Sequence, residues 1–462
     1  MYFFTWGEDG PNAELELFDG DVLVGTPFAK LSAGECGRTA GAKRRKILLH
    51  VDGAVSGEHM AEVRTRPTDK VASVRRAVAD AAGVKTPQVR LLKGQQILAD
   101  SASIAASGLR DGSTLGAVLC TPDALVLTAS ADGTSKLWRV EDGRCLQTYE
   151  GHQYQVVTAA FSPDGLSVVT ASLDGTAKVW GVENSACIHT LDGRDYQVVS
   201  AGFSPDGEAV VTTPLDETAK IWCAKDGVCL CTLRGHRDVV LSSKFSPDGA
   251  SVITRSVDGT AKLWLTADGS CVQTFQCSGT AAKIAVFSAD GACLLTSGPN
   301  QTAKLWRRQG STGRFLLGKT LKGHEGEVTS GDFSPDGTLV VTASSDGTAR
   351  LWSVAEDTDR SLSLVGHTAE VKATAFAPGG ARLATASSDG TARLWSVADG
   401  ACLQVLAGHT AEVSSVAFSP DGELLLTASA DGTAGLWCAR SGAHLHALEG
   451  HSASVLSAVF SP

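Results

Sequence analysis

From about residue 120 onward, short apolar segments alternate with polar turns in a pattern that repeats to the end of the chain. In one copy, FSPDGLSVVTAS (161–172) is an apolar segment that follows a Ser-Pro-Asp-Gly turn, which predicts a turn and a strand. DGTAKVW (174–180) predicts a tight turn and a second strand, and ACIHTL (186–191) predicts a third. A Trp closes each copy of the second strand, and successive Trp residues are 42, 42, 42, 42, 46, 43 and 42 positions apart.

This period predicts an all-β propeller, since about 42 residues provide the four short strands of one blade. The repeats resemble the WD-repeat β-propeller family over residues 120–462. Its marks are a Gly-His pair, a turn Asp and a Trp, which stand here as Gly151-His152, Asp174 and Trp180. The resemblance implies a buried hydrogen-bonded set in each blade, completed here by Thr170 or Ser172. The sets it implies are His152, Asp174 and Trp180; His236, Asp258 and Trp264; His324, Asp346 and Trp352; His367, Asp389 and Trp395; His409, Asp431 and Trp437; and His451, Asp132 and Trp138.

Two repeats lack the histidine. Arg194 stands in its place before Asp216, and a cation there could still pair with the carboxylate. Ser278 replaces the second histidine, and the matching Asp has become Asn300. Because polar groups in this second repeat lose partners, we expect the segment 279–306 to be the least stable of the repeats.

The two ends of the repeat region are complementary. Each Gly-His position precedes its turn Asp by 22 residues, but His451 has no Asp after it and Asp132 has no His before it. We therefore expect His451 to serve Asp132, and residues 454–462 to supply the innermost strand of the blade at 124–149. This closure predicts eight blades of four antiparallel strands. The alternative is that the chain is a fragment cut inside a ninth repeat.

Residues 46–119 show a different pattern. Two alternating segments precede TDKVASVRRAVADAAG (68–83), in which apolar residues fall at helical spacing after a Thr-Asp cap, and two further short segments follow. This order resembles the ubiquitin-like β-grasp fold, a small α+β domain. The segment STLGAVL (113–119) could be its last strand or the first strand of the propeller, and closure by 454–462 assigns it to the small domain. We expect residues 1–45 to be a partly disordered N-terminal extension.

The ubiquitin resemblance implies binding without conjugation. No Gly-Gly tail follows Leu119, so the domain should not be conjugated to other proteins. The resemblance also implies an apolar receptor-binding patch at Leu92 and Val118, although Leu92 fits an ordinary sheet position equally well.

The repeats vary most at two positions that the resemblance places on the partner-binding face of the propeller. The residue before the turn Asp is larger and apolar in Leu173, Leu215, Val257 and Pro299. Tyr154 and Tyr196, two of only four tyrosines, follow the histidine position in adjacent repeats. Exposed aromatic and apolar clusters are typical of binding sites, although divergence between duplicated repeats would give the same pattern. We expect an aromatic and apolar sector at Tyr154, Tyr196, Leu173, Leu215 and Val257, and an acidic sector at Glu327, Glu370 and Glu412.

Composition narrows the possible partners. Residues 120–462 carry 25 basic and 36 acidic side chains, a net charge of −11, which disfavours nucleic acid and anionic membranes. Five cysteines recur seven residues after a Trp, where we expect them to act as small buried hydrophobic residues. Cys229-x-Cys231 and His444-x-His446 fit strand alternation better than a metal site. Lys43-Arg44-Arg45-Lys46 fits a solvated linker better than a nuclear-import signal.

These observations predict a protein without enzymatic activity, cofactor or metal. We expect a monomeric scaffold or adaptor of the cytoplasm or nucleus, whose propeller binds other proteins and whose ubiquitin-like domain links them to ubiquitin-handling machinery. The alternative is the regulatory portion of a larger multidomain enzyme of which this chain is a fragment.

Overall fold

The structure is a computed structural model, and it describes residues 14–18, 21–24, 47–53, 59–82, 89–93, 96–98, 102–119, 124–193, 196–277, 281–298, 300–310, 313–355 and 361–462. The chain divides into two compact units, Met1–Pro122 and Asp123–Pro462. Each unit is described by itself.

The first unit contains one mixed sheet with the strand order β2-β1-β4-β3-β7-β5-β6 and a single helix. β3 and β4 form an antiparallel pair, β7 runs parallel to β3, and β5 is antiparallel to β7. STLGAVL is therefore a strand of this sheet. The elements are β1 (Glu14–Phe18), β2 (Asp21–Val24), β3 (Ile47–Gly53), β4 (His59–Thr65), α1 (Val71–Ala82), β5 (Val89–Lys93), β6 (Gln96–Ile97) and β7 (Ser113–Leu119).

The core of this unit follows the helical and strand periodicity of the sequence. Val74 and Val78 of α1 are fully buried, together with Leu49, Val63 and Leu115 of the sheet. A difference from the sequence expectation lies in residues 1–45, where two segments form strands. β1 pairs in parallel with β4 and antiparallel with β2, so the extension widens the sheet on the side of β4.

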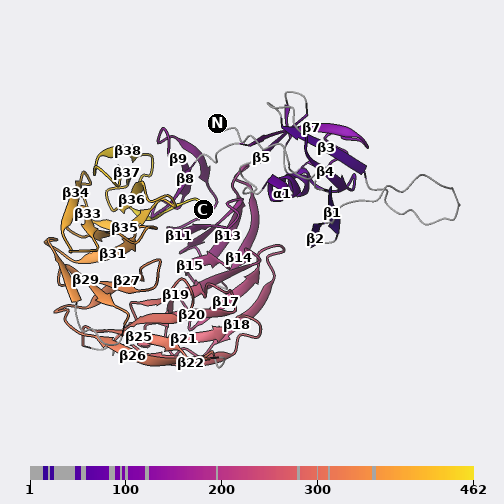
Figure 1. Cartoon of the computed structure of the whole chain (residues 1–462). Coiled ribbons are helices and arrows are strands. Elements are labelled where there is room, and N and C mark those ends of the chain that lie inside the picture. The colour runs from indigo at the N-terminus through magenta and orange to yellow at the C-terminus, as the bar shows by residue number, and fades with distance from the viewer. Residues whose placement is uncertain are drawn as a thin grey trace. The chain divides into compact units, whose positions relative to one another are not determined.

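The second unit contains eight four-stranded antiparallel sheets among its described residues. Seven of them use four consecutive strands each, and they follow one another around a ring (Figure 1). These sheets are β11 (Val156–Phe161), β12 (Ser167–Ser172), β13 (Thr176–Gly181) and β14 (Cys187–Asp192); β15 (Val198–Phe203), β16 (Ala209–Pro214), β17 (Thr218–Cys223) and β18 (Cys229–Arg234); β19 (Val240–Phe245), β20 (Ser251–Ser256), β21 (Thr260–Leu265) and β22 (Cys271–Gln276); β23 (Ala285–Phe287), β24 (Cys293–Ser297), β25 (Ala303–Arg308) and β26 (Phe315–Leu321); β27 (Val328–Phe333), β28 (Leu339–Ser344), β29 (Thr348–Ser353) and β30 (Ser361–Val365); β31 (Val371–Phe376), β32 (Arg382–Ser387), β33 (Thr391–Ser396) and β34 (Cys402–Ala407); and β35 (Val413–Phe418), β36 (Leu424–Ser429), β37 (Ala434–Cys438) and β38 (His444–Leu448).

The remaining sheet joins the two ends of the unit. Its order is β10-β9-β8-β39, formed by β8 (Leu125–Ser130), β9 (Ser135–Arg139), β10 (Cys145–Tyr149) and β39 (Val455–Phe460). β39 pairs antiparallel with β8, with Ala458 opposite Thr128. β39 also packs against β35 and β11, the first strands of the two neighbouring sheets.

Apolar layers between adjacent sheets hold the ring together. Trp180 of β13, for example, packs with Leu127, Leu137 and Tyr149 of the sheet that contains β39. Each repeat supplies the same kind of layer, because every second residue of its middle strands is buried.

The recurring cysteines correct the sequence interpretation. Cys145, Cys187, Cys229, Cys271 and Cys402 are exposed, whereas we had expected them to be buried. Each begins the outermost strand of its sheet, next to a register shift in the pairing with the Trp-bearing strand. An outermost strand has no neighbour on one side, so only its later residues, such as Leu191 and Leu233, reach the core.

Candidate partner-binding face

The sheet β11–β14 illustrates how each repeat fixes the turns at one end of its strands. His152 Nδ1 lies 2.8 Å from Asp174 Oδ2, and His152 Nε2 lies 2.8 Å from Thr170 Oγ1. Trp180 Nε1 donates to the same hydroxyl at 2.8 Å. Because the carboxylate can only accept, Nδ1 of the neutral ring carries the proton and Nε2 accepts from the threonine.

This geometry chooses between the two hydroxyl side chains left open by the sequence. Thr170 is the fourth member of the hydrogen-bonded set. Ser172 instead donates to the Tyr154 carbonyl at 3.0 Å and accepts from the Asp174 backbone N–H at 3.1 Å. Ser172 therefore ties the turn before Asp174 to the turn that carries Tyr154.

The same contacts recur in six sheets. The distances from His Nδ1 to Asp Oδ2 range from 2.8 to 3.0 Å, and the backbone N–H that follows each histidine donates to the same oxygen. The pairs are His152–Asp174, His236–Asp258, His324–Asp346, His367–Asp389, His409–Asp431 and His451–Asp132. The Trp residues of all eight sheets, Trp138, Trp180, Trp222, Trp264, Trp306, Trp352, Trp395 and Trp437, donate to a strand threonine at 2.8 or 2.9 Å.

The electrostatics of these sets favour a neutral imidazole beside an ionised carboxylate. Burial would raise the pKa of Asp132, but hydrogen bonds from Thr134, His451 and two backbone N–H groups lower it to about 2. Burial lowers the pKa of His451 below its usual value of 6.5, although Asp132 partly opposes that shift. Both groups are held in these states by structure, which argues for a stabilising role and not for proton transfer.

A lysine takes over part of the role of the missing histidine in two sheets. Lys220 Nζ donates to the Gly193 carbonyl at 3.2 Å, and Lys304 Nζ donates to the Gln276 carbonyl at 2.9 Å. Each ammonium group also lies 5.8 Å from the ring centre of the Trp in its own strand, Trp222 or Trp306. In a sheet that keeps the histidine, the equivalent Lys178 instead donates to Thr190 of the outermost strand.

The sequence analysis missed this role. Lysine occupies the same repeat position in sheets with and without the histidine, so lysine alone carries no signal. Only its coincidence with a missing histidine could have indicated the different contact. The predicted replacements Arg194 and Ser278, together with Pro299, lie outside the described residues, and Asn300 is exposed in a turn with a φ of 55°.

The structure brings the predicted aromatic and apolar residues onto consecutive turns. The Leu173 backbone N–H donates to the Gln155 carbonyl, next to Tyr154, and the Leu215 N–H donates to the Gln197 carbonyl, next to Tyr196. The two turns adjoin, since a Cβ on Gly175 would lie 3.5 Å from the Tyr196 carbonyl. The Val257 N–H donates in the same way to Val239 of the next sheet.

These side chains differ in exposure. Tyr154 is 65% exposed, Tyr196 is 51% exposed and Val257 is 38% exposed, whereas Leu173 and Leu215 are half-buried. The two tyrosines are therefore the most accessible apolar groups of this sector, and the leucines support them from below. We call Tyr154, Tyr196, Leu173, Leu215 and Val257 the tyrosine sector.

The predicted acidic sector is less acidic than the sequence suggests. Glu412 pairs with Lys372 at 2.7 Å, and Glu327 lies 3.6 Å from Lys283. In both pairs the lysine comes from a neighbouring repeat, 40 or 44 positions earlier, so a search for charges one repeat apart could have found them. Glu370 is half-buried.

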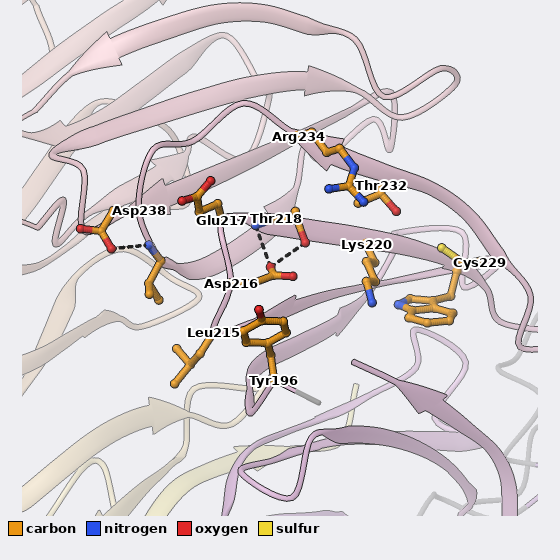
Figure 2. Close-up of a pocket in the computed structure, with 12 residues that line it drawn as sticks. Tyr196, Leu215, Asp216, Glu217, Thr218, Lys220, Cys229, Thr232, Arg234 and Asp238 are labelled. Atoms are coloured by element: carbon orange, nitrogen blue, oxygen red, sulfur yellow. Dashed lines mark hydrogen bonds between the residues drawn. The ribbon is translucent and has the colours of Figure 1, made fainter. Parts of the chain in front are cut away.

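A pocket of about 590 Å³ opens beside Tyr196 (Figure 2). It lies in the sheet β15–β18 and is lined by Tyr196, Leu215, Asp216, Glu217, Thr218, Lys220, Trp222, Cys229, Thr232, Arg234, Asp238 and Val239.

The predicted patch of the first unit is described only by its backbone. Leu92 lies in β5 opposite Gly116 of β7, and Val118 of β7 lies opposite Arg90. The two residues therefore lie on adjacent strands of one sheet, and their side chains fall outside the described ones.

The described residues offer no site for a metal ion or a membrane span. No group of three or more His, Cys, Asp or Glu side chains among them could hold a metal. No helix in that part of the chain is long and apolar enough to cross a membrane.

The repeats define a class of protein, and comparison with known families agrees. The WD40 family (WD domain, G-beta repeat) matches residues 143–181, 185–223, 227–264, 269–307, 316–353, 359–396 and 400–438. The chain belongs to the WD40 family. Repeats of this family generally mediate interactions between proteins and are typically not enzymes.

Other comparisons add the fold. The chain is similar to the crystal structure of the computationally designed Ika8 protein, with a TM-score of 0.59 and 28% identity over 68% of this chain and 93% of that one. No curated protein matches the chain. The family matches end at residue 438, because the sheet β10-β9-β8-β39 takes its strands from both ends and is not one continuous repeat.

Proposed function

We propose that this protein is a non-enzymatic scaffold whose repeat region forms a closed eight-bladed propeller and binds other proteins through the tyrosine sector. The observation that carries this proposal is the accessibility of Tyr154 and Tyr196 on adjoining turns. Tyrosine side chains bury a large area at low conformational cost and are enriched at binding hot spots. The half-buried leucines beneath them provide a rigid base.

The hydrogen-bonded sets support the same function. They hold the turns at one end of the strands in fixed positions, through bonds to His, Thr and Trp side chains. Binding groups on rigid turns lose little entropy when a partner docks. No described residue is left to propose for catalysis.

We also propose that residues 46–119 are a ubiquitin-like domain that links the bound proteins to ubiquitin-handling machinery. The hairpin β3–β4, the helix α1 and the return of β7 parallel to β3 support this assignment. Leu92 and Val118, on adjacent strands, are the proposed contact residues. The chain would act as a monomer in the cytoplasm or nucleus.

The test is affinity capture from a cell lysate with three forms of the full chain. The variant Tyr154→Ala/Tyr196→Ala should lose proteins that the wild type captures. The control Leu316→Ala/Leu317→Ala removes two exposed apolar side chains from the outermost strand β26 and should keep them. An identical set of captured proteins for all three forms would contradict binding through the tyrosine sector.

The ubiquitin link is tested separately. Leu92→Ala should lose ubiquitin-pathway proteins and keep the proteins that depend on the tyrosines. If Leu92→Ala leaves the captured set unchanged, the proposed role of the small domain is wrong, and the scaffold function of the propeller is unaffected.

A further inference from the structure

The pocket beside Tyr196 lies in a sheet that has lost its histidine. In six other sheets, Oδ2 of the turn aspartate accepts one bond from a histidine Nδ1–H and one from a backbone N–H. In this sheet, the Asp216 carboxylate accepts the Thr218 backbone N–H at 2.8 Å and the Thr218 hydroxyl at 2.6 Å, both on Oδ1. Among the described residues, no group donates to Oδ2 of Asp216.

A half-buried carboxylate oxygen without a donor is unfavourable, and it creates a strong site for one. Figure 2 shows the Asp216 carboxylate in the middle of the pocket, with Tyr196 and Leu215 beside it. Trp222 lines the far side, and its indole N–H is already bound to Thr212. The pocket thus combines an acceptor with aromatic and apolar walls.

The charges of the pocket are arranged unevenly. Glu217 and Asp238 lie on one side of Asp216 in Figure 2, and Lys220 and Arg234 lie on the other. Lys220 is 6% exposed and is bound to the Gly193 carbonyl, so its charge is turned toward the backbone and the Trp222 ring. The side of Asp216 that faces Glu217 and Asp238 therefore favours a cation.

We propose that this pocket binds the basic side chain, arginine or lysine, of a protein partner. This inference rests on the proposed function, because it names the chemistry that the tyrosine sector recognises. The guanidinium or ammonium group donates to Oδ2 of Asp216, where the other sheets place a histidine. The aliphatic part of the side chain packs against Tyr196 and Leu215, whose aromatic and apolar surfaces suit a cation with an apolar stem.

A library of random 12-residue peptides displayed on phage provides the probe. It is selected on the wild-type chain, on Asp216→Asn and on the control Asp226→Asn. Asp226 is a fully exposed aspartate in the turn at the other end of β17, so the control changes the net charge equally and leaves the pocket intact. Thermal unfolding verifies that each variant is folded.

We expect the wild type and Asp226→Asn to select peptides that share an arginine or lysine, and Asp216→Asn not to select them. Replacing that basic residue by methionine in a selected peptide should weaken its binding to the wild type about tenfold and leave its binding to Asp216→Asn unchanged. Selected peptides without a common basic residue, or with equal affinity for Asp216→Asn, would overturn the proposal.

The outcomes separate this proposal from the proposed function. Peptides that need Tyr154 but no basic residue would overturn the pocket assignment and leave partner binding by the tyrosine sector intact. Peptides whose binding is indifferent to both Tyr154 and Tyr196 would overturn both.

Discussion

Asp132 and His451 are 319 positions apart in the chain, yet Nδ1 of the histidine lies 2.8 Å from Oδ2 of the aspartate. The following residue, Ser452, donates its backbone N–H to the same oxygen at 3.0 Å. These contacts repeat those of His152 and Asp174 within one repeat. The last residues of the chain thus complete the sheet that its first repeat begins.

Removing residues 452–462 should strongly destabilise the propeller. The deletion exposes the edge of β8 and the apolar layers next to β11 and β35, although it keeps His451. We expect a fall of more than 10 °C in the midpoint of thermal unfolding, because burial of a whole inner strand is lost. Circular dichroism measures it.

The matched control is deletion of residues 1–45, whose described strands pair only within the first unit. It should leave the unfolding transition of the propeller unchanged. Equal midpoints for the wild type and the 452–462 deletion would show that β39 does not support the ring.

Two aspartates at the same repeat position should differ in their contribution to stability. Asp258 accepts bonds from His236 and the Arg237 backbone N–H, whereas Oδ2 of Asp216 has no such donors among the described residues. Asp258→Asn should cost about 2 kcal/mol, because an amide group then faces N–H donors. Asp216→Asn should change the unfolding free energy by less than about 0.5 kcal/mol. Urea unfolding tests the pair, and equal losses would refute the difference.

The two lysine environments make a similar comparison. Lys220→Met removes a donor from the buried Gly193 carbonyl and should cost about 1 kcal/mol. Lys178→Met removes only a bond to Thr190 near the surface and should be close to neutral. If both substitutions are neutral in urea unfolding, Lys220 does not take the place of the missing histidine.

Stability should fall as the pH falls below neutrality. Burial lowers the pKa values of His152, His236, His324, His367 and His451, so the unfolded chain binds protons more readily than the folded one. The contribution of these residues is fully present above the ordinary histidine pKa of 6.5 and is lost as the pH falls through the lower values of the folded state. Below pH 4 the carboxylates act in the same direction, since Asp132, Asp389 and Asp431 have pKa values lowered to about 2. Urea midpoints between pH 8 and 5 should decrease steadily, and a constant or rising midpoint would contradict this account.

The sequence predicted the repeat elements well because their signals are local. The Ser-Pro-Asp-Gly turns, the alternating strands and the spacing of 22 residues between His and Asp each lie within one repeat. The contact between His451 and Asp132 was also predictable, because each residue lacked its partner within the chain order. The assignment of STLGAVL to the small sheet followed from that pairing.

Features that depend on neighbouring elements were less predictable. The cysteines were expected to be buried because alternation places them in a strand, but alternation does not reveal that the strand is outermost. The contacts of Lys220 and the pairing of Glu412 with Lys372 depend on which repeats lie side by side. The strands β1 and β2 lie in a segment expected to be partly disordered, and their pairing with β4 is contact across more than 40 residues.

Amide hydrogen exchange of the last strand tests the closure of the ring most directly. β35 and β39 are both innermost strands, each paired with one strand of its own sheet. In the intact protein, peptides that cover Val455–Phe460 should exchange as slowly as peptides that cover Val413–Phe418. Exchange of the last strand at the rate of an unpaired chain end, with β35 still protected, would contradict closure by the C-terminus.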